Sequence, residues 1–200
     1  MLIEMHEVGG IERALHAMRS PYQSWERSDS TGDNVGPSDL TLSQSLADRG
    51  TEHAKHLRQI VVWATISAPR YWWTQFDTYR YGVEKVSTST MHTIMRRDFT
   101  EDDFENPGFF IKTKAIPYLN AKRKEYLEAE SAYEKKVIWD TIIKVLPQSY
   151  LQERDVMMSY AAIASMCKQR KGHKLGERAE FIRWAQDLPH FDLTGVKADV

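Results

Sequence analysis

The pattern of apolar and polar residues predicts two strands in the first third of the 200-residue chain. Residues 1–8 alternate between apolar and polar side chains and stop at Gly9-Gly10, which is typical of an edge strand. Residues 59–66 form a short, nearly continuous run rich in β-branched side chains, and Pro69 ends it. This run is the strongest strand signal in the sequence.

Apolar residues spaced three and four apart predict helices over most of the remaining chain. The predicted helices cover residues 11–18, 38–49, 70–80, 87–95, 112–145, 152–168 and 177–188. Between the first two lies segment 20–38, which is rich in Ser, Asp, Gly and Pro and predicts a long surface loop. We therefore expect one α+β domain over residues 1–200, dominated by helices, with a flexible loop at 20–38 and a tail at 190–200.

Composition narrows the class of protein without indicating a function. Hydrophobic residues make up 42% of the chain and charged residues 28%, which is ordinary for a globular protein. No apolar run reaches the ~18 residues that a membrane span needs, so we expect a cytoplasmic protein that does not bind membranes. The single cysteine, Cys167, excludes an intrachain disulfide. A balance of 27 basic and 28 acidic residues argues against a general nucleic-acid binder.

Aromatic residues concentrate in one short segment. Six of them fall within residues 71–81, directly after the second predicted strand. Such a cluster forms either a buried core helix or a flat surface for a ring-shaped ligand. Arg70, Gln75 and Arg80 interrupt the aromatics, and a run of hydroxyl residues follows at 87–90. Guanidinium, amide and hydroxyl groups in this order suit a planar phosphorylated ligand such as a nucleotide.

Other chemistries have weaker signals. His53 and His56 would share a face of a helix, as in metal sites, but no third ligand is evident. Cys167 has no cysteine partner nearby and lies in an apolar helix, which favours an inert thiol. Basic residues cluster at 168–178, where they form either a solvated helix end or an anion-binding or nucleic-acid-binding patch. The sequence contains no glycine-rich phosphate loop and no nucleophile elbow.

The order of several short segments resembles the flavin-dependent thymidylate synthases. Members of that family typically run Arg-Gly-His-x-Ser-x-x-Glu-His, a strand, Ser-Arg, Gln or Glu, Arg-His-Arg and a serine-rich segment. This chain has Gly50-Thr51-Glu52-His53-Ala54-Lys55-His56, then the strand to Ser67, then Arg70 and Gln75-Phe76-Asp77-Thr78-Tyr79-Arg80. Residues 18–22, 40–50 and 146–170 are similar to further family segments, so the resemblance touches most of the chain.

This resemblance implies a homotetrameric α+β fold with a small antiparallel sheet. It also implies FAD as cofactor, dUMP or a related pyrimidine nucleotide as substrate, and methylenetetrahydrofolate and NADPH as co-substrates for a reductive methylation. The reduced flavin does the chemistry in such an enzyme, so no protein nucleophile is expected. The resemblance assigns nucleotide contacts to Arg70, Gln75, Ser87, Ser89 and Arg170. It assigns flavin contacts to Tyr79, Arg80 and His56.

The chain departs from the family pattern at several contacts. Thr78-Tyr79-Arg80 stands where Arg-His-Arg is expected, and Thr90-Met91 stands where Arg-Tyr would follow the serine. Replacing Arg by Thr removes charge-assisted hydrogen bonds to phosphate. The sequence is therefore compatible with a divergent enzyme of this type and with a nucleotide-binding protein that has lost methyl transfer. A nucleic-acid-binding module that uses the patch at 168–178 is the least favoured alternative.

Overall fold

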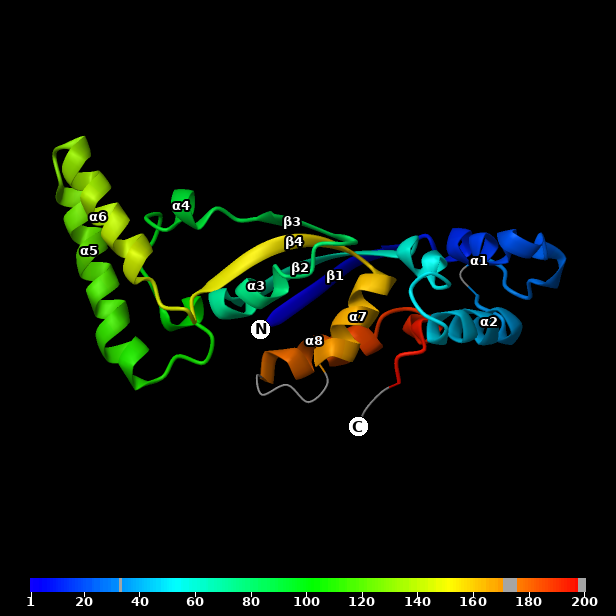
Figure 1. The fold of residues 1–200 in the computed structure, drawn as a ribbon. Coiled ribbons are helices and arrows are strands. Elements are labelled where there is room, and N and C mark those ends of the chain that lie inside the picture. Colours follow the sequence, from blue (N-terminus) through cyan, green and yellow to red (C-terminus); the bar gives the residue numbers. More distant parts are fainter. Residues whose placement is uncertain (33, 171–175, 198–200) are drawn as a thin grey trace. The chain divides into compact units, whose positions relative to one another are not determined.

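The described residues form a four-stranded antiparallel sheet in the order β1-β2-β4-β3. The computed structural model describes residues 1–32, 34–170 and 176–197. Its strands are β1 (Leu2–Gly9), β2 (Val61–Pro69), β3 (Val83–Ser87) and β4 (Leu151–Ser159) (Figure 1). The Tyr160 amide donates to the Ile60 carbonyl at 2.9 Å, and the Ser159 amide donates to the Gly82 carbonyl at 2.8 Å. Two predicted strands are thus confirmed, and β1 lies at an edge.

The helices confirm the predicted helix-rich α+β class. They are α1 (Ile11–Arg19), α2 (Pro37–Asp48), α3 (Arg70–Phe76), α4 (Thr90–Thr93), α5 (Ile116–Glu128), α6 (Ala132–Val145), α7 (Tyr160–Arg170) and α8 (Gly176–Gln186). Within the described ranges, every helix is too short or too polar to cross a membrane. Short 3-10 turns at Ser20–Tyr22, Trp25–Arg27 and Lys55–Arg58 connect several of these elements.

The helix predicted at 152–168 is wrong over its first half, which is strand β4. Val156 and Met158 are buried whereas Asp155 is exposed, so burial follows the period of two that a strand requires. The backbone of β4 pairs with β2 on one side and β3 on the other. This pairing satisfies its amides and carbonyls and overrides the local helix preference of its side chains.

The aromatic helix is also shorter than predicted. α3 ends at Phe76, so Tyr79 and Arg80 lie in the turn that leads to β3, a strand that the apolar pattern does not reveal. Gly82 has a φ of +68° in this turn, and a Cβ there would lie 2.4 Å from the Ser159 hydroxyl. Glycine is therefore required where β3 approaches the end of β4.

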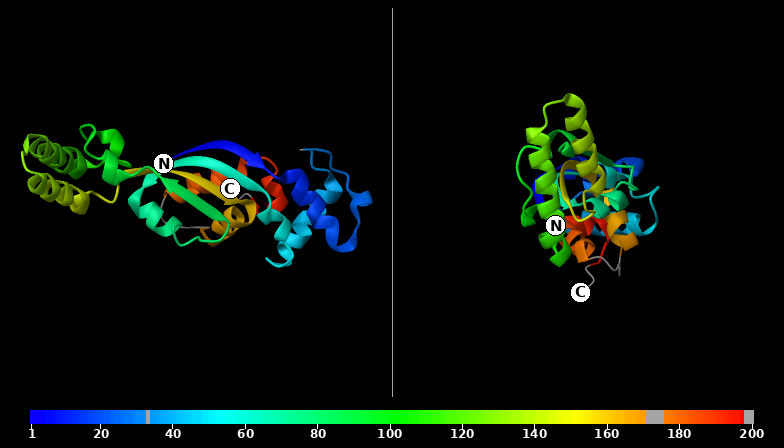
Figure 2. Two further views of the ribbon diagram at one scale, coloured as in Figure 1. Left: turned by 90° about the horizontal axis from the view of Figure 1, so that it is seen from above. Right: turned by 90° about the vertical axis from the view of Figure 1, so that its left-hand side faces the viewer.

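The long helical segment predicted at 112–145 consists of two helices. α5 follows a turn of π-helix at Ile111–Ala115, and α6 begins at a capping box formed by Ser131 and Glu134. The Glu134 amide donates to the Ser131 hydroxyl at 3.1 Å, which satisfies an amide in the first turn. α5 and α6 lie side by side as a hairpin (Figures 1 and 2).

The chain divides into two compact units. Unit 1 comprises Met1–Leu2, Ser67–Asp77 and Ser87–Arg154, and unit 2 comprises Ile3–Ile66, Thr78–Val86 and the described part of 155–200. The expectation of one domain over 1–200 stays a prediction.

Unit 1 contains the α5–α6 hairpin and the aromatic helix. Its buried cluster consists of Ile94, Phe99, Phe104, Leu119, Ile142 and Leu146. Trp72, Trp73 and Phe76 on α3 are at most 5% exposed and pack ring against ring at 4.8–5.3 Å. Of the two interpretations of the aromatic segment, the structure supports the buried core for these three residues.

Unit 2 contains α1, α2, α7 and α8. Gly10 turns the chain from β1 into α1 at a φ of +91°, where a Cβ would lie 2.2 Å from the Gln59 carbonyl. The Tyr160 hydroxyl at the start of α7 donates to the Pro189 carbonyl. In the segment expected to be a tail, Phe191–Thr194 form a 3-10 turn with Phe191 and Leu193 buried. Phe191, Leu193 and Thr194 therefore belong to the core of unit 2, and residues 198–200 lie outside the described ranges.

Candidate functional site

Unit 2 has a large cavity that is bounded by three segments of the resemblance. Its volume is about 1,070 Å³, which is large enough for a nucleotide or a dinucleotide. The end of α1 and the segment after it, one side of α2, and the stretch that leads to β2 form its walls. The lining residues are Ala17, Met18, Arg19, Pro21, Tyr22, Ser24, Glu26, Arg27, Leu42, Leu46, Arg49, Glu52, His53, Lys55, His56 and Gln59.

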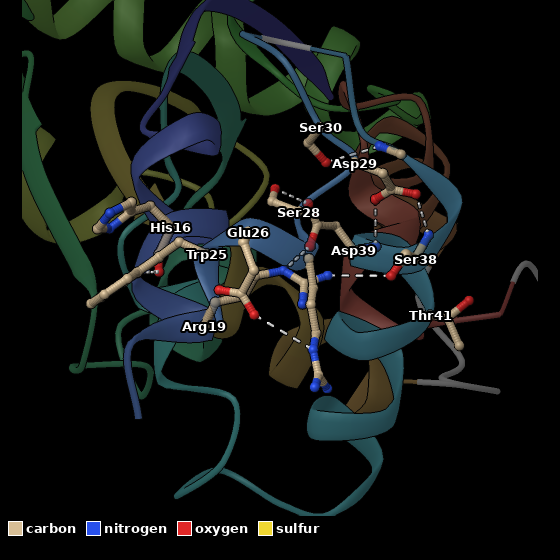
Figure 3. A network of polar contacts seen from close by, with 12 residues as sticks. His16, Arg19, Trp25, Glu26, Ser28, Asp29, Ser30, Ser38, Asp39 and Thr41 are labelled. Atoms are coloured by element: carbon tan, nitrogen blue, oxygen red, sulfur yellow. Dashed lines mark hydrogen bonds and ion pairs between the residues drawn. The ribbon is translucent and has the colours of Figure 1, made fainter. Parts of the chain in front are cut away.

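A buried ion pair fixes the wall formed by α1 and α2. The Arg19 Nε donates to Asp39 Oδ1 at 2.6 Å, and both side chains are at most 5% exposed. The Ser28 hydroxyl donates to Asp39 Oδ2 at 2.6 Å (Figure 3). Because both carboxylate oxygens accept hydrogen bonds, the buried charge is compensated and α1, α2 and residue 28 are held together.

The predicted loop at 20–38 is therefore tied to both helices where the structure describes it. Asp29 accepts hydrogen bonds from the amides of Ser38 and Asp39 at 2.8 and 3.0 Å, which caps the start of α2 (Figure 3). The Trp25 indole donates to the His16 carbonyl at 3.2 Å, and the two rings stack at 5.3 Å. Ser38 and Asp39, which the sequence suggests as caps of this helix, therefore lie inside its first turn, and Asp29 supplies the cap instead.

The electrostatics of Asp39 favour its charged form. Burial would raise the pKa of this carboxyl group, but hydrogen bonds from Ser28, Ser30 and Arg19 and the charge of Arg19 outweigh that effect. The pKa of Asp39 is consequently lowered, and the carboxylate stays ionised at neutral pH.

His56 is a buried, uncharged residue that lines the cavity. The Ser43 hydroxyl donates its one hydrogen to the Leu193 carbonyl at 2.8 Å, so it accepts from His56 Nε2, which lies 2.7 Å away. The proton is therefore on Nε2, and Nδ1 carries a lone pair. Nδ1 is buried and has no hydrogen-bond partner. Burial lowers the pKa of His56 to about 4, so the ring is uncharged at neutral pH.

The rim of the cavity carries more positive than negative charge. Arg27, Arg49 and Lys55 are exposed there, whereas Glu26 and Glu52 are the acidic residues. Arg27 lies 3.6 Å from Glu26, and Arg49 and Lys55 form no ion pair with any described residue. Tyr22, 91% exposed, adds an aromatic ring at the edge. Such a rim can hold an anionic ligand whose flat part enters the cavity.

The site residues predicted from the resemblance fall in both units. In unit 2 the Arg170 Nε donates to the Tyr79 hydroxyl at 2.6 Å, so the structure brings these two residues together. The Arg170 guanidinium also lies 5.3 Å from the centre of the Tyr79 ring. His56 lines the cavity, and Arg80 is exposed and forms no hydrogen bond within the described ranges.

The other four predicted residues lie in unit 1. The Arg70 guanidinium donates to the Leu146 carbonyl at 2.9 Å, which is a structural contact. Gln75 is half-buried on α3, and Ser87 is exposed at the end of β3. Ser89 precedes α4, and its hydroxyl lies 2.6 Å from His92 Nδ1. The structure therefore groups Tyr79 with Arg170 and gives Arg70 and Ser89 partners within unit 1.

Some residues of the site could not be recognised from the sequence. Arg19 and Asp39 lie twenty positions apart, one just after the first predicted helix and the other at the start of the second, and Ser43 shows no motif. The one signal in the sequence for Asp39 is that a charged residue occupies a position where the helix pattern predicts burial. The predicted histidine pair separates, because His56 is buried against Ser43 while His53 is exposed on the cavity wall.

The basic cluster at 168–178 and Cys167 have distinct environments. Residues 171–175 lie outside the described ranges. Arg178 is only 5% exposed, so it does not belong to a solvated helix end, whereas Lys168 is exposed.

Cys167 is buried, and burial raises the pKa of its thiol to about 12, which agrees with the predicted inert thiol.

Comparisons with solved structures identify the fold. The chain is similar to flavin-dependent thymidylate synthase ThyX from Helicobacter pylori complexed with FAD and dUMP, with a TM-score of 0.73 at 17% identity over 94% of each chain. A second structure, Thymidylate Synthase X from Helicobacter pylori with FAD and dUMP, gives a TM-score of 0.75 at 16% identity, over 98% of this chain and 100% of that chain. No protein-family model and no curated protein matches the chain.

Proposed function

We propose that this protein is a divergent enzyme of the flavin-dependent thymidylate synthase type, which binds FAD and methylates dUMP or a related pyrimidine nucleotide. Its fold is that of proteins solved with FAD and dUMP, over nearly the whole of both chains. The observation that carries the proposal is the cavity of unit 2. Its walls come from the segments at 18–22, 40–50 and 50–56, which also carry the sequence resemblance.

The polar groups of the cavity fit a ligand with an imide ring. His56 Nδ1 is a buried acceptor without a partner, so a ligand N–H that reaches it would remove the cost of leaving that atom unpaired. Uracil and the flavin ring system both carry such an N–H. The cations at the rim, Arg49 and Lys55, suit the phosphates of a nucleotide or of FAD.

In this proposal the protein binds and orients, while the cofactor supplies the reactivity. Reduced FAD would provide the reducing power, with NADPH as its source and methylenetetrahydrofolate as the donor of the one-carbon unit. His56 would fix the orientation of the bound ring, because its neutral tautomer only accepts at Nδ1. The apolar lining from Met18, Leu42 and Leu46 would exclude water around that ring.

The assignments made by resemblance form part of the proposal. They place the nucleotide at Arg70, Gln75, Ser87, Ser89 and Arg170. They place the flavin at Tyr79, Arg80 and His56. A homotetramer is also part of the proposal, and exposed side chains on unit 1 such as Phe109 and Phe110 are compatible with burial between copies of the chain.

Loading the purified protein with FAD tests this function. After incubation with FAD and removal of free ligand, we expect the protein to keep the visible absorption band of flavin. We also expect dUMP to raise the melting temperature further, and the variant Tyr22→Ala to weaken binding relative to the control Tyr133→Ala on α6. A colourless protein that cannot be loaded with FAD would contradict the proposal.

One observation favours a second function, in which the chain binds a nucleotide without methyl transfer. Thr78 and Tyr79 replace two cationic or ring-nitrogen contacts that the family pattern expects, and Arg170 already donates to the Tyr79 hydroxyl. Thermal-shift measurements with pyrimidine nucleotides, with and without FAD, separate the two functions. Stabilisation by nucleotide alone, with no effect of FAD, would support the second.

A further inference from the structure

Arg178 is a buried cation whose donors are not all used. It lies in the first turn of α8 and is 5% exposed. Its Nε and Nη1 atoms are buried and have no hydrogen-bond partner. A guanidinium group stays protonated in proteins, so the side chain cannot escape this cost by losing its charge. A buried donor without a partner destabilises the fold unless a ligand supplies an acceptor.

A second arginine and a tyrosine lie near Arg178. The charge of Arg170, at the end of α7, lowers the pKa of Arg178 in addition to the effect of burial, while Tyr79 and Glu177 act in the opposite direction. Arg170 is held in place by its hydrogen bond of 2.6 Å to the Tyr79 hydroxyl. Two guanidinium groups that repel each other at a partly dehydrated position are stabilised when an anion binds both.

The position of Arg178 on α8 also favours an anion. The helix has eleven residues and begins at Gly176, so Arg178 lies where the first-turn amides point out of the helix. These amides and the helix dipole attract negative charge. Glu177 is the carboxylate closest in sequence, and it accepts no hydrogen bond from Arg178 Nε or Nη1.

We propose that Arg178 and Arg170 form an anion-binding site for a phosphate or diphosphate group. The planar fork of donors on a guanidinium matches phosphate oxygens. The site also accounts for a departure from the family pattern. Thr78 stands beside Tyr79 where that pattern has an arginine, and Arg178 supplies a cation near the same tyrosine. The identity of the molecule that carries the phosphate rests on the proposed function, whereas the anion site itself does not.

Binding of inorganic pyrophosphate to the full chain tests the site. Calorimetric titration at low salt should show binding to the wild type, and affinity should fall about 10-fold or more in Arg178→Gln, because charge-assisted hydrogen bonds are lost. Arg170→Gln should lower the affinity as well. The control is Arg183→Gln on the same helix, where Nε of Arg183 donates weakly to the Ala179 carbonyl at 3.4 Å. This control should bind like the wild type.

The pyrophosphate titration still tests the site if Arg178→Gln disturbs folding. Circular dichroism checks each variant, and Arg170→Gln, at a half-buried position, carries the test if Arg178→Gln does not fold. Absence of pyrophosphate binding by the wild type overturns the proposal. Equal affinities of the Arg178, Arg170 and Arg183 variants overturn it too.

The same variants identify the source of the phosphate. If the site holds FAD, Arg178→Gln should weaken FAD binding and leave riboflavin binding unchanged. If it holds dUMP, the variant should weaken dUMP binding and leave deoxyuridine unchanged. Arg178-dependent binding of pyrophosphate, together with no binding of FAD or dUMP, would support the anion site and contradict the proposed function.

Discussion

At the scale of single residues, His56 has a structural contact in the fold and a ligand contact in the proposed function. Its Nε2–H donates to Ser43, whose hydroxyl in turn links α2 to the turn at 191–194, while Nδ1 is a buried acceptor without a hydrogen-bond partner. Accepting a hydrogen bond at Nδ1 requires the neutral ring, whereas donation from Nε2 does not. The low pKa that burial produces is therefore what keeps the acceptor available at neutral pH.

The pKa of His56 predicts a loss of stability in mild acid. The unfolded chain takes up a proton near the ordinary pKa of 6.5, whereas the folded chain does so only near pH 4. The unfolded state therefore binds more protons between these values, and the free energy of unfolding should fall by about 3 kcal/mol as the pH drops from 6.5 to 4. Urea unfolding at several pH values measures this, and His56→Gln should remove that part of the pH dependence.

His53→Gln is the matched control for His56, because His53 is exposed and three residues away. It should leave the pH dependence of the wild type unchanged. Equal pH dependence in the two variants would show that His56 is not the group responsible.

The ion pair between Arg19 and Asp39 predicts a strong effect of a small substitution. Asp39→Asn leaves a buried arginine without its counter-charge, which should lower the free energy of unfolding by about 3–5 kcal/mol. Asp98→Asn is the control, since Asp98 pairs with Arg123 at 2.6 Å but is 68% exposed, and should cost less than about 1 kcal/mol. Chemical denaturation at pH 7 compares the two, and similar losses would contradict a special role for the buried pair.

The sequence predicts the chemistry of the site only in part. It indicates a phosphorylated planar ligand and singles out His56, Tyr79 and Arg170, of which the structure joins the last two. It does not reveal the unpaired state of His56 Nδ1 or of Arg178, because a missing hydrogen bond depends on three-dimensional surroundings. The Arg19–Asp39 pair is hidden for the same reason, since a long irregular segment separates the partners.

At the scale of secondary structure elements, the junction of β4 with α7 depends on one glycine. The Ser159 hydroxyl accepts a hydrogen bond from the Ala162 amide at 3.2 Å and so caps α7. This hydroxyl fits there because Gly82, which lies against it, has no side chain. Gly82→Ala should lower the free energy of unfolding by about 1–3 kcal/mol, because of its positive φ and the contact with Ser159. Gly108→Ala, with open space around it, should change stability by less than about 1 kcal/mol. Thermal unfolding measures both, and equal melting temperatures would contradict this account.

Elements were predictable where local pattern and tertiary environment agree. β1, β2 and α1 show clear periodicity and the structure confirms them. β4 differs, because its side chains favour a helix locally whereas its place between two strands imposes extended backbone. β3 has only five residues and one fully buried side chain, Val83, so its pattern is too short to be distinguished from a loop.

At the scale of the whole molecule, two separate cores predict two regions of local stability. Ile142 lies in the buried cluster of unit 1, and Ile163 lies in the core of unit 2; both are 0% exposed. Ile142→Ala should destabilise by about 2–5 kcal/mol and accelerate hydrogen exchange mainly in α5 and α6. Ile163→Ala should instead act on α7 and its neighbours. Equal acceleration throughout the chain by either variant would show a single cooperative domain.

The buried thiol of Cys167 makes the native chain a convenient background for spectroscopic labelling. Cys167 is 4% exposed and its pKa is raised, so maleimide dyes and nitroxide reagents should not react with the folded protein. A cysteine introduced at the highly exposed Tyr22 would then be the single reactive position, at the rim of the cavity. Spin-label mobility at that position, recorded before and after adding FAD or dUMP, would report directly on how the segment after α1 responds to a ligand.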